Sequence, residues 1–162
     1  MFSADFSVGK NNYPILSAFA ESKVDTLVVT THCRRLSIDT NIDIIQLGGI
    51  LRHSSLSCVG RHAEEALNDF SCSKLFLGVD GIDLDLGITT TDMMEASLNR
   101  VMMQTAQKTI VLADSSKFGR RGFSKIADLK DVDQIITDSK ISPSVAKKIE
   151  EMGIDLTIVE TH

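Results

Sequence analysis

Small polar residues that could hold a phosphate group follow the apolar segments of this chain. They are glycines, hydroxyl residues and one lysine, namely Gly48, Gly49, Gly81, Thr30, Thr31, Ser115 and Lys117. Free backbone amides, hydroxyls and a cation are groups that bind phosphate esters and sugar hydroxyls. The residue types therefore favour a phosphorylated sugar as ligand. The alternative is that such residues end strands only because turns need them.

One segment concentrates cations in a chain whose net charge is −5. After an apolar run, the chain continues through Asp114 and two serines to Lys117. Arg120 and Arg121 follow. A bound anion would explain this arrangement. A solvated loop in which Lys117 and Arg121 pair with nearby carboxylates would explain it equally well. The sequence leaves both interpretations open.

Other kinds of site find little support in the sequence. No G-x-G-x-x-G follows an apolar run, and no G-x-x-x-x-G-K-[ST] occurs. S-x-x-K occurs at Ser71–Lys74 and at Ser144–Lys147 without the companion motifs that would give it meaning. His53, Cys58 and His62 do not have the spacing of a standard metal site. We therefore expect no metal and no cofactor.

Short, continuous apolar runs precede the polar residues. The runs are Thr26–Val29, Ile42–Leu47, Leu75–Val79, Thr109–Ala113, Gln134–Ile136 and Leu156–Val159. Continuous runs with β-branched residues are typical of strands that are buried on both faces of a parallel sheet. In such a sheet a ligand binds outside the carboxyl ends of the strands. We therefore expect five strand ends and their polar residues to converge at one edge.

Segments with helical spacing lie between these runs. They are residues 13–22, Glu64–Phe70, Asp92–Gln107 and Pro143–Met152. Before and after the last of them, Ser142 can cap the helix and Gly153 can end it. Strands that alternate with helices indicate right-handed β-α-β crossovers. We predict one α/β domain over residues 1–162, a doubly wound, mostly parallel sheet with helices on both faces.

Composition excludes several functions. The chain is 43% hydrophobic and 24% charged, which is ordinary for a folded domain. Its net negative charge and its 5% aromatic content oppose direct nucleic-acid binding. No apolar stretch approaches the ~20 residues of a spanning helix, and the N-terminus lacks a signal sequence. We expect a cytoplasmic protein that does not contact a membrane.

The segment Asp92–Gln107 carries more apolar residues than one buried stripe requires. They include Met93, Met94, Val101, Met102 and Met103. Successive helical residues point about 100° apart, so three adjacent apolar residues cannot all face one core. Either a second chain covers part of this helix, or the helix is sunk deeply within the domain.

Taken in order, the strand ends resemble those of a known family. The motifs are V-V-T-T at 28–31, Q-L-G-G-I-L at 46–51, V-G-R-H-A-E-E-A-L at 59–67, F-L-G-V-D-G-I-D at 76–83, G-I-T-T at 87–90, L-A-D-S-S-K-F-G at 112–119 and I-I-T-D at 135–138. Over roughly residues 24–160, this ordered set resembles the C-terminal sensor domain of DeoR-family transcriptional regulators. The ordered combination is more specific than any single motif.

The resemblance implies a sugar-phosphate sensor, and not an enzyme, with a fold similar to that of ribose-5-phosphate isomerase, glucosamine-6-phosphate deaminase and the CoA transferases. In such regulators a winged helix-turn-helix precedes the sensor and binds operator DNA. The residues before Val24 do not offer such a domain, so we expect an isolated effector domain that reaches DNA only through a missing N-terminal domain. The resemblance also favours a homo-oligomer.

The predicted ligand site combines the strand ends with the resemblance. Its residues are Gly9, Lys10, Asn11, Asn12, Thr30, Thr31, Gly48, Gly49, Asp80, Gly81, Thr89, Asp114 and Lys117. The chain departs from the family at two places. At the first, residues 7–12 stand in place of the family's D-S-G-T-T-like loop and keep its glycine but neither of its threonines. At the second, Thr31 and His32 stand where the family commonly has an asparagine after the threonine of the second strand. These departures leave the identity of the effector open.

Two alternatives to sensing follow from the same residues. Asp80–Asp83 is similar to the D-G-A-D-E loop of ribose-5-phosphate isomerase, and Asp114–Lys117 to its A-D-x-S-K element. However, Leu84 replaces the last acid of that loop, and Leu84–Thr91 contains no lysine where the enzyme has one. We therefore expect binding without catalysis. The other alternative is a scaffold that only oligomerises, because the first loop is altered.

Overall fold

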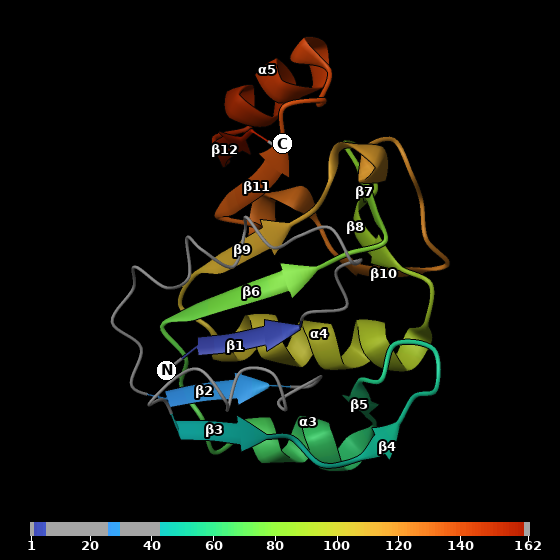
Figure 1. Ribbon diagram of the computed structural model, residues 1–162, viewed down its shortest axis with the longest axis vertical. Helices are drawn as coiled ribbons and strands as arrows, with labels where there is room; N and C mark the ends of the chain where they lie inside the picture. The colour runs from blue at the N-terminus through green and yellow to red at the C-terminus, as the bar shows by residue number, and fades with distance from the viewer. Residues whose placement is uncertain (1, 6–25, 30–42, 161–162) are drawn as a thin grey trace.

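Seven strands form one sheet in the order β12-β11-β9-β6-β1-β2-β3 (Figure 1). The computed structural model describes residues 2–5, 26–29 and 43–160. The strands are β1 (Phe2–Asp5), β2 (Thr26–Val29), β3 (Asp43–Gln46), β6 (Lys74–Gly78), β9 (Thr109–Leu112), β11 (Gln134–Asp138) and β12 (Asp155–Val159). Every pairing between neighbours in this sheet is parallel. The predicted α/β class is confirmed, and each of the six predicted apolar runs contributes a strand.

Alternate residues of the central strands face opposite sides of the sheet. Leu75 and Leu77 of β6 and Val111 of β9 pack into the large core. Ile110 and Leu112 of β9 pack into a smaller cluster on the other side. Both faces of these strands are therefore buried, which explains why the sequence shows continuous apolar runs instead of alternation.

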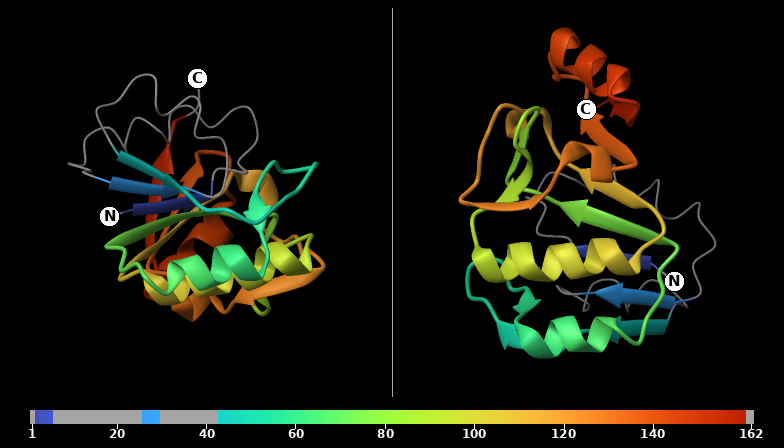
Figure 2. Two further views of the ribbon diagram at one scale, coloured as in Figure 1. Left: turned by 90° about the horizontal axis from the view of Figure 1, so that it is seen from below. Right: turned by 180° about the vertical axis from the view of Figure 1, so that it is seen from behind.

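Three described helices pack on the large core. They are α3 (Arg61–Leu67), α4 (Met93–Thr105) and α5 (Pro143–Glu151). Figure 2 shows α3 and α4 side by side across one face of the sheet. Leu67, Met102 and Ile149, one from each helix, are fully buried in the same cluster. The helix predicted over residues 13–22 lies outside the described residues.

The helix ends differ in part from the prediction. α3 begins three residues before Glu64 and ends at Leu67, because the chain after it closes in short turns. Pro143 begins α5 and Gly153 follows it at a φ of 81°, as predicted. The predicted side-chain cap is wrong, because the Ser142 hydroxyl pairs with that of Ser144 at 2.9 Å and makes no capping bond.

Two small antiparallel sheets stand near the carboxyl ends of the central strands (Figure 1). One consists of β7 (Gly81–Asp83), β8 (Gly87–Thr90) and β10 (Ser124–Ala127), and the other of β4 (Ile50–Leu51) and β5 (Cys58–Val59). Two short 3₁₀ turns, η1 (Ser115–Lys117) and η2 (Leu129–Asp131), complete the described elements. Among the described residues, no helix has the length and apolar character that crossing a membrane would require.

Candidate functional site

Polar residues follow four described strands at one edge of the sheet. Because β3, β6, β9 and β11 are parallel members of one sheet, their carboxyl ends lie at the same edge. The predicted site residues in the described part of the chain are Gly48, Gly49, Asp80, Gly81, Thr89, Asp114 and Lys117. The remaining predicted residues, Gly9, Lys10, Asn11, Asn12, Thr30 and Thr31, lie outside the described residues.

Two of the predicted glycines are required by close contacts within the protein. Gly49 has a φ of 142°, and a Cβ there would lie 2.6 Å from the carbonyl oxygen of Val59 in β5. A Cβ at Gly81 would lie 2.5 Å from the carbonyl oxygen of Arg120. These glycines let β5 and the segment before β10 approach the strand ends. Gly48, by contrast, is exposed, with open space around a Cβ.

The hydroxyl of Thr89 has partners within the protein. Thr89 is 0% exposed. Its Oγ1 donates to the carbonyl oxygen of Gly81 at 3.2 Å and accepts from the backbone amide of Gly122 at 2.8 Å. Thr89 thus joins β7, β8 and the segment before β10, and its buried hydroxyl is engaged within the protein.

Asp80 follows β6 and is held in one orientation. Its Oδ2 accepts hydrogen bonds from Thr90 Oγ1 at 2.9 Å, from the Thr91 amide at 2.9 Å and from Thr91 Oγ1 at 3.1 Å. Among the described residues, no donor contacts its Oδ1. Asp80 is half-buried, so an oriented carboxylate oxygen is available at the edge to accept a hydrogen bond.

Asp114 and Asp138 shape the loop that carries Lys117. Asp114 Oδ1 accepts from the Ser116 amide at 2.9 Å and so caps η1. Asp138, at the end of β11, accepts from the amides of Ser115 at 2.7 Å and of Lys140 at 2.8 Å. Burial raises the pKa of Asp138, but these hydrogen bonds outweigh it and hold its pKa below the usual value. An ionised carboxylate therefore fixes the start of η1.

Of the three cations in the cation-rich loop, one is paired, whereas Lys117 and the exposed Arg120 form no ion pair with a described residue. Arg121 forms a two-point contact with Asp83, from Nε to Oδ2 at 2.7 Å and from Nη2 to Oδ1 at 3.0 Å. Lys117 is half-buried and forms no ion pair with any residue in the described part of the chain. The interpretation as a paired surface loop therefore fits Arg121, whereas Lys117 offers an ammonium group at the edge.

The sequence analysis missed a buried charge cluster beside the edge. Glu95, in the first turn of α4, is 7% exposed. Its Oε1 lies 2.7 Å from Arg52 Nη1 and accepts from Ser55 Oγ at 2.5 Å and from Ser57 Oγ at 2.9 Å. A usable signal was present, because Glu95 occupies the helix face that also carries Leu98 and Met102, both buried. A carboxylate on a core-facing stripe requires a buried partner.

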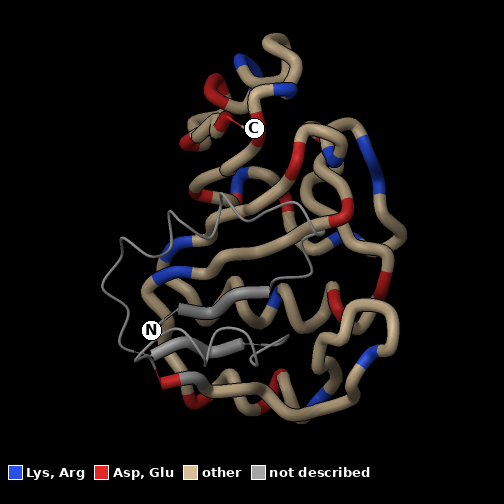
Figure 3. Tube along the Cα trace, viewed as in Figure 1, with Lys and Arg blue, Asp and Glu red and all other residues tan. Residues whose placement is uncertain are grey.

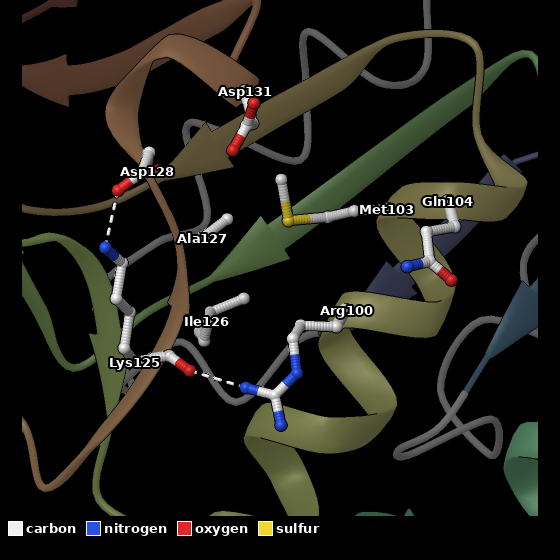
Figure 4. A pocket seen from close by; sticks show the side chains of 8 residues that line it. All are labelled: Arg100, Met103, Gln104, Lys125, Ile126, Ala127, Asp128 and Asp131. Carbon is white, nitrogen blue, oxygen red and sulfur yellow. Dashed lines mark hydrogen bonds and ion pairs between the residues drawn. The ribbon is translucent and has the colours of Figure 1, made fainter.

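A pocket of about 590 Å³ lies elsewhere, between α4 and the segment from β10 to η2 (Figure 4). Its lining residues are Arg100, Met103, Gln104, Lys125, Ile126, Ala127, Asp128 and Asp131. None of the predicted site residues lines it. Its cations are engaged, because Arg100 Nη1 donates to the Lys125 carbonyl oxygen at 2.6 Å and the Lys125 ammonium pairs with Asp128. We therefore place the candidate site at the sheet edge.

Comparison with known proteins identifies the family. Residues 9–139 match the model of the DeoR C terminal sensor domain. The chain is 37% identical over 139 residues to the uncharacterized HTH-type transcriptional regulator YulB of Bacillus subtilis, covering 84% of this chain and 54% of that protein. It is 33% identical over 141 residues to the HTH-type transcriptional regulator GlpR of Haloferax volcanii, covering 85% and 54%.

A third relative is a named repressor. The HTH-type transcriptional repressor GlcR of Bacillus subtilis is 31% identical over 140 residues, covering 85% of this chain and 54% of that protein. The chain spans about half the length of the curated relatives that it matches. The relatives are named as regulators and the matching model as a sensor domain, which confirms the prediction of a regulatory rather than an enzymatic domain. The chain belongs to the DeoR C terminal sensor domain family.

Proposed function

We propose that this chain senses a phosphorylated sugar at the carboxyl edge of its sheet, within a DeoR-type transcriptional regulator. The observation that carries the proposal is Lys117, a half-buried ammonium group at this edge with no carboxylate partner among the described residues. A partly desolvated cation without a carboxylate partner favours a bound anion. The match to a sensor domain supports a regulatory role for that anion.

The described residues suggest a division of roles. Lys117 binds the phosphate as a point charge. Asp80, whose Oδ1 has no donor among the described residues, accepts hydrogen bonds from sugar hydroxyls. Asp114 holds the η1 turn from which Lys117 projects, and the exposed Gly48 leaves space for the ligand beside β3. Gly9, Lys10, Asn11, Asn12, Thr30 and Thr31 complete the proposed site.

Thermal unfolding with a ligand panel tests this proposal. The panel contains ribose 5-phosphate, glucose 6-phosphate and fructose 6-phosphate beside the three free sugars. A ligand at a hundred times its Kd adds about 2.7 kcal/mol to the free energy of unfolding. Lys117→Ala should remove most of the shift, since a hydrogen bond to a charged group contributes about 1.5–3 kcal/mol. Lys147→Ala, on the exposed face of α5, is the matched control and should keep the shift.

Two results would contradict the proposal. One is the absence of a shift with every sugar phosphate in the panel. The other is an equal shift with the free sugars, which would remove the role of the phosphate group.

We propose that the chain contacts DNA only through another domain of the same regulator. Lys and Arg positions are interspersed with Asp and Glu along the described chain (Figure 3). The net charge is −5. High affinity for a phosphate backbone requires several clustered cations, which this distribution does not supply. A role in transcription also supports the cytoplasmic location that we propose for the protein.

We also propose that a second copy of the chain covers an apolar surface beside the site. Five large apolar side chains are exposed on β4, on the turn between β4 and β5 and at the start of α4, namely those of Ile50, Leu51, Leu56, Met93 and Met94. The side chains from β4 and α4 meet, because a Cβ at Gly60 would lie 3.3 Å from Met94 Cε and 3.6 Å from Ile50 Cδ1. We call these five residues the apolar surface.

The exposure of these side chains supports a dimer. Apolar side chains gathered on the surface of a soluble protein commonly mark a contact with another chain. A two-fold contact is the commonest arrangement because one patch then covers its own copy.

A further inference from the structure

The hydroxyl of Thr90 lies between two carboxylates. Thr90 Oγ1 is 2.9 Å from Asp80 Oδ2 and 3.3 Å from Glu95 Oε2. Thr90 is 4% exposed and Glu95 is 7% exposed, so the three groups meet in a buried position. A hydroxyl has one proton, and it therefore donates to only one of these carboxylates at a time.

In this structure the geometry favours Asp80 as the acceptor. A distance of 2.9 Å falls within the usual range of an O–H···O hydrogen bond, whereas 3.3 Å exceeds it. Glu95 Oε1 receives Arg52, Ser55 and Ser57, while Thr90 is the described donor to Oε2. Among the described residues, the second oxygen of this buried carboxylate therefore has only a long contact.

Glu95 anchors the turn at residues 52–57, which joins β4 to β5. Three side chains of this turn converge on its Oε1, and Arg52 Nη2 also lies 3.3 Å from Asp92 Oδ2. The turn closes on itself through the bonds from the Arg52 amide to the Ser57 carbonyl and from the Leu56 amide to the Arg52 carbonyl, both 2.9 Å. Leu56 of the turn belongs to the apolar surface.

Asp80, for its part, does not depend on Thr90. The amide and the hydroxyl of Thr91 both donate to the same Oδ2. Thr90 can therefore turn away from Asp80 while the aspartate remains held and its Oδ1 receives a sugar hydroxyl.

We propose that Thr90 is the positioning residue that couples the ligand site to the 52–57 turn. A ligand hydroxyl that donates to the free Oδ1 of Asp80 draws negative charge from this carboxylate and weakens its bond to Thr90, whose proton then turns to Glu95 Oε2. Glu95 gains its missing hydrogen bond, which fixes its carboxylate in the orientation that receives the 52–57 turn, and the turn opens less often. The inference rests on the proposed function, because it requires a ligand at Asp80. Through Leu56 of the turn, ligand binding then affects the apolar surface.

Hydrogen exchange at the Leu56 amide measures the opening of the turn without any ligand. Asp80→Asn replaces a charged acceptor by a weaker, neutral one, so the Thr90 proton should move to Glu95. We expect the exchange to slow by about threefold to tenfold, the effect of fixing one long side chain before the turn closes on it. Thr90→Ser keeps the hydroxyl and should preserve this slowing, whereas Thr90→Val removes it and should abolish the response to Asp80→Asn.

Two further variants test whether the effect of Asp80→Asn depends on the Thr90 hydroxyl alone. Thr91→Val loses a hydroxyl that donates to Asp80 alone, so the slowing by Asp80→Asn should persist. Thermal unfolding shows whether Thr90→Val folds. If it does not, Thr90→Ala replaces it as the variant without the hydroxyl. Equal slowing by Asp80→Asn with and without the Thr90 hydroxyl, or no slowing in the wild-type background, would overturn the proposal.

A ligand arm separates this inference from the proposed function. Ribose 5-phosphate, glucose 6-phosphate and fructose 6-phosphate should each slow Leu56 exchange if they bind, whereas sulfate, which has no hydroxyl to donate, should not. If no sugar phosphate binds, the proposed function fails, but the Asp80→Asn comparison still decides whether Thr90 couples the two carboxylates. If a sugar phosphate binds and leaves Leu56 exchange unchanged, the coupling fails and the proposed function stands.

Discussion

Lys117 and Arg121 belong to one short cation-rich loop, yet their surroundings separate them. Arg121 reaches Asp83 of β7 through two hydrogen bonds, whereas Lys117 has no ion-pair partner in the described part of the chain. The sequence could not distinguish them, because the pairing depends on how closely β7 approaches the loop. The Ile82 carbonyl accepts from the Gly119 amide at 2.8 Å and so fixes this approach.

The Asp83–Arg121 pair should make unfolding sensitive to acid. The hydrogen bond from Arg121 lowers the pKa of Asp83 to about 2. The pKa of an aspartate in an unfolded chain is about 3.9. A lowered folded-state pKa stabilises the protein above pH 4, and this contribution is lost as the pH falls from about 4 to about 2. The melting temperature should therefore fall more steeply in this window for the wild type than for Asp83→Asn.

Arg121→Ala gives an independent check of the same pair. The substitution should return the pKa of Asp83 toward its ordinary value, which NMR titration of the carboxyl carbon measures directly. An unchanged pKa would show that the backbone amides of Asp85 and Leu86, which also donate to Asp83, determine it instead.

At the level of elements, the first turn of α4 joins the helix to the 52–57 turn through Glu95. Glu95→Ala should lower the free energy of unfolding by about 1–3 kcal/mol, because it leaves the hydroxyl of Ser57 and the partly buried Arg52 without their shared carboxylate acceptor, although Arg52 keeps Asp92. Glu65→Ala is the matched control, since it removes an i, i+4 pair whose arginine is 86% exposed. Such a surface pair contributes only about 0–1 kcal/mol.

Chemical denaturation of both variants measures this difference. Similar losses for the two variants would mean that the buried cluster adds little to stability. In that case the contacts of Arg52, Ser55 and Ser57 with Glu95 Oε1 would orient the 52–57 turn without stabilising the fold.

Six of the seven strands of the central sheet could be predicted from the sequence because of where they lie, whereas β1 (Phe2–Asp5) was not among the predicted runs. Strands buried on both faces leave continuous apolar runs, and six such runs were visible. The strands β4, β5, β7, β8 and β10 could not be predicted, because they are only two to four residues long and show no period. Their existence depends on pairings between distant segments, such as Ser124 with Thr90.

The candidate site was predictable to a similar extent. The position of ligand sites in parallel sheets predicted Asp80, Asp114 and Lys117, and each of them follows the carboxyl end of a strand. That Gly49 and Gly81 accommodate neighbouring backbone was not predictable, because the approaching segments belong to the small sheets. The Arg52–Glu95 pair was missed for the same reason, since β4 and β5 bring its two members together.

For the whole molecule, the apolar surface has a measurable consequence. Met102 is buried and Val101 and Met103 are half-buried, whereas Met93 is 66% exposed. The two explanations for the excess apolar residues of α4 thus apply to different parts of the helix. Its middle is packed within the domain, and its beginning is exposed. Sedimentation velocity at tens of micromolar should show a dimer, which Ile50→Glu together with Met93→Glu should convert to a monomer.

Phe123→Glu is the control for this experiment. Phe123 is also highly exposed but does not belong to the apolar surface. If this variant dissociates the dimer while the paired glutamate variant does not, the interface lies elsewhere on the molecule. A wild-type chain that sediments as a monomer would refute self-association under these conditions.

The place of β1 in the sheet affects how the domain is made in the cell. β1 lies between β2 and β6, so one of its edges stays unpaired until residues 74–78 have been synthesised. At ~5–20 residues per second, the roughly 70 intervening residues take several seconds to emerge from a ribosome. During that time a strand with an open edge can pair with other chains. Nascent chains of this domain should therefore be clients of chaperones that act at the ribosome, even though the finished sheet encloses β1 on both sides.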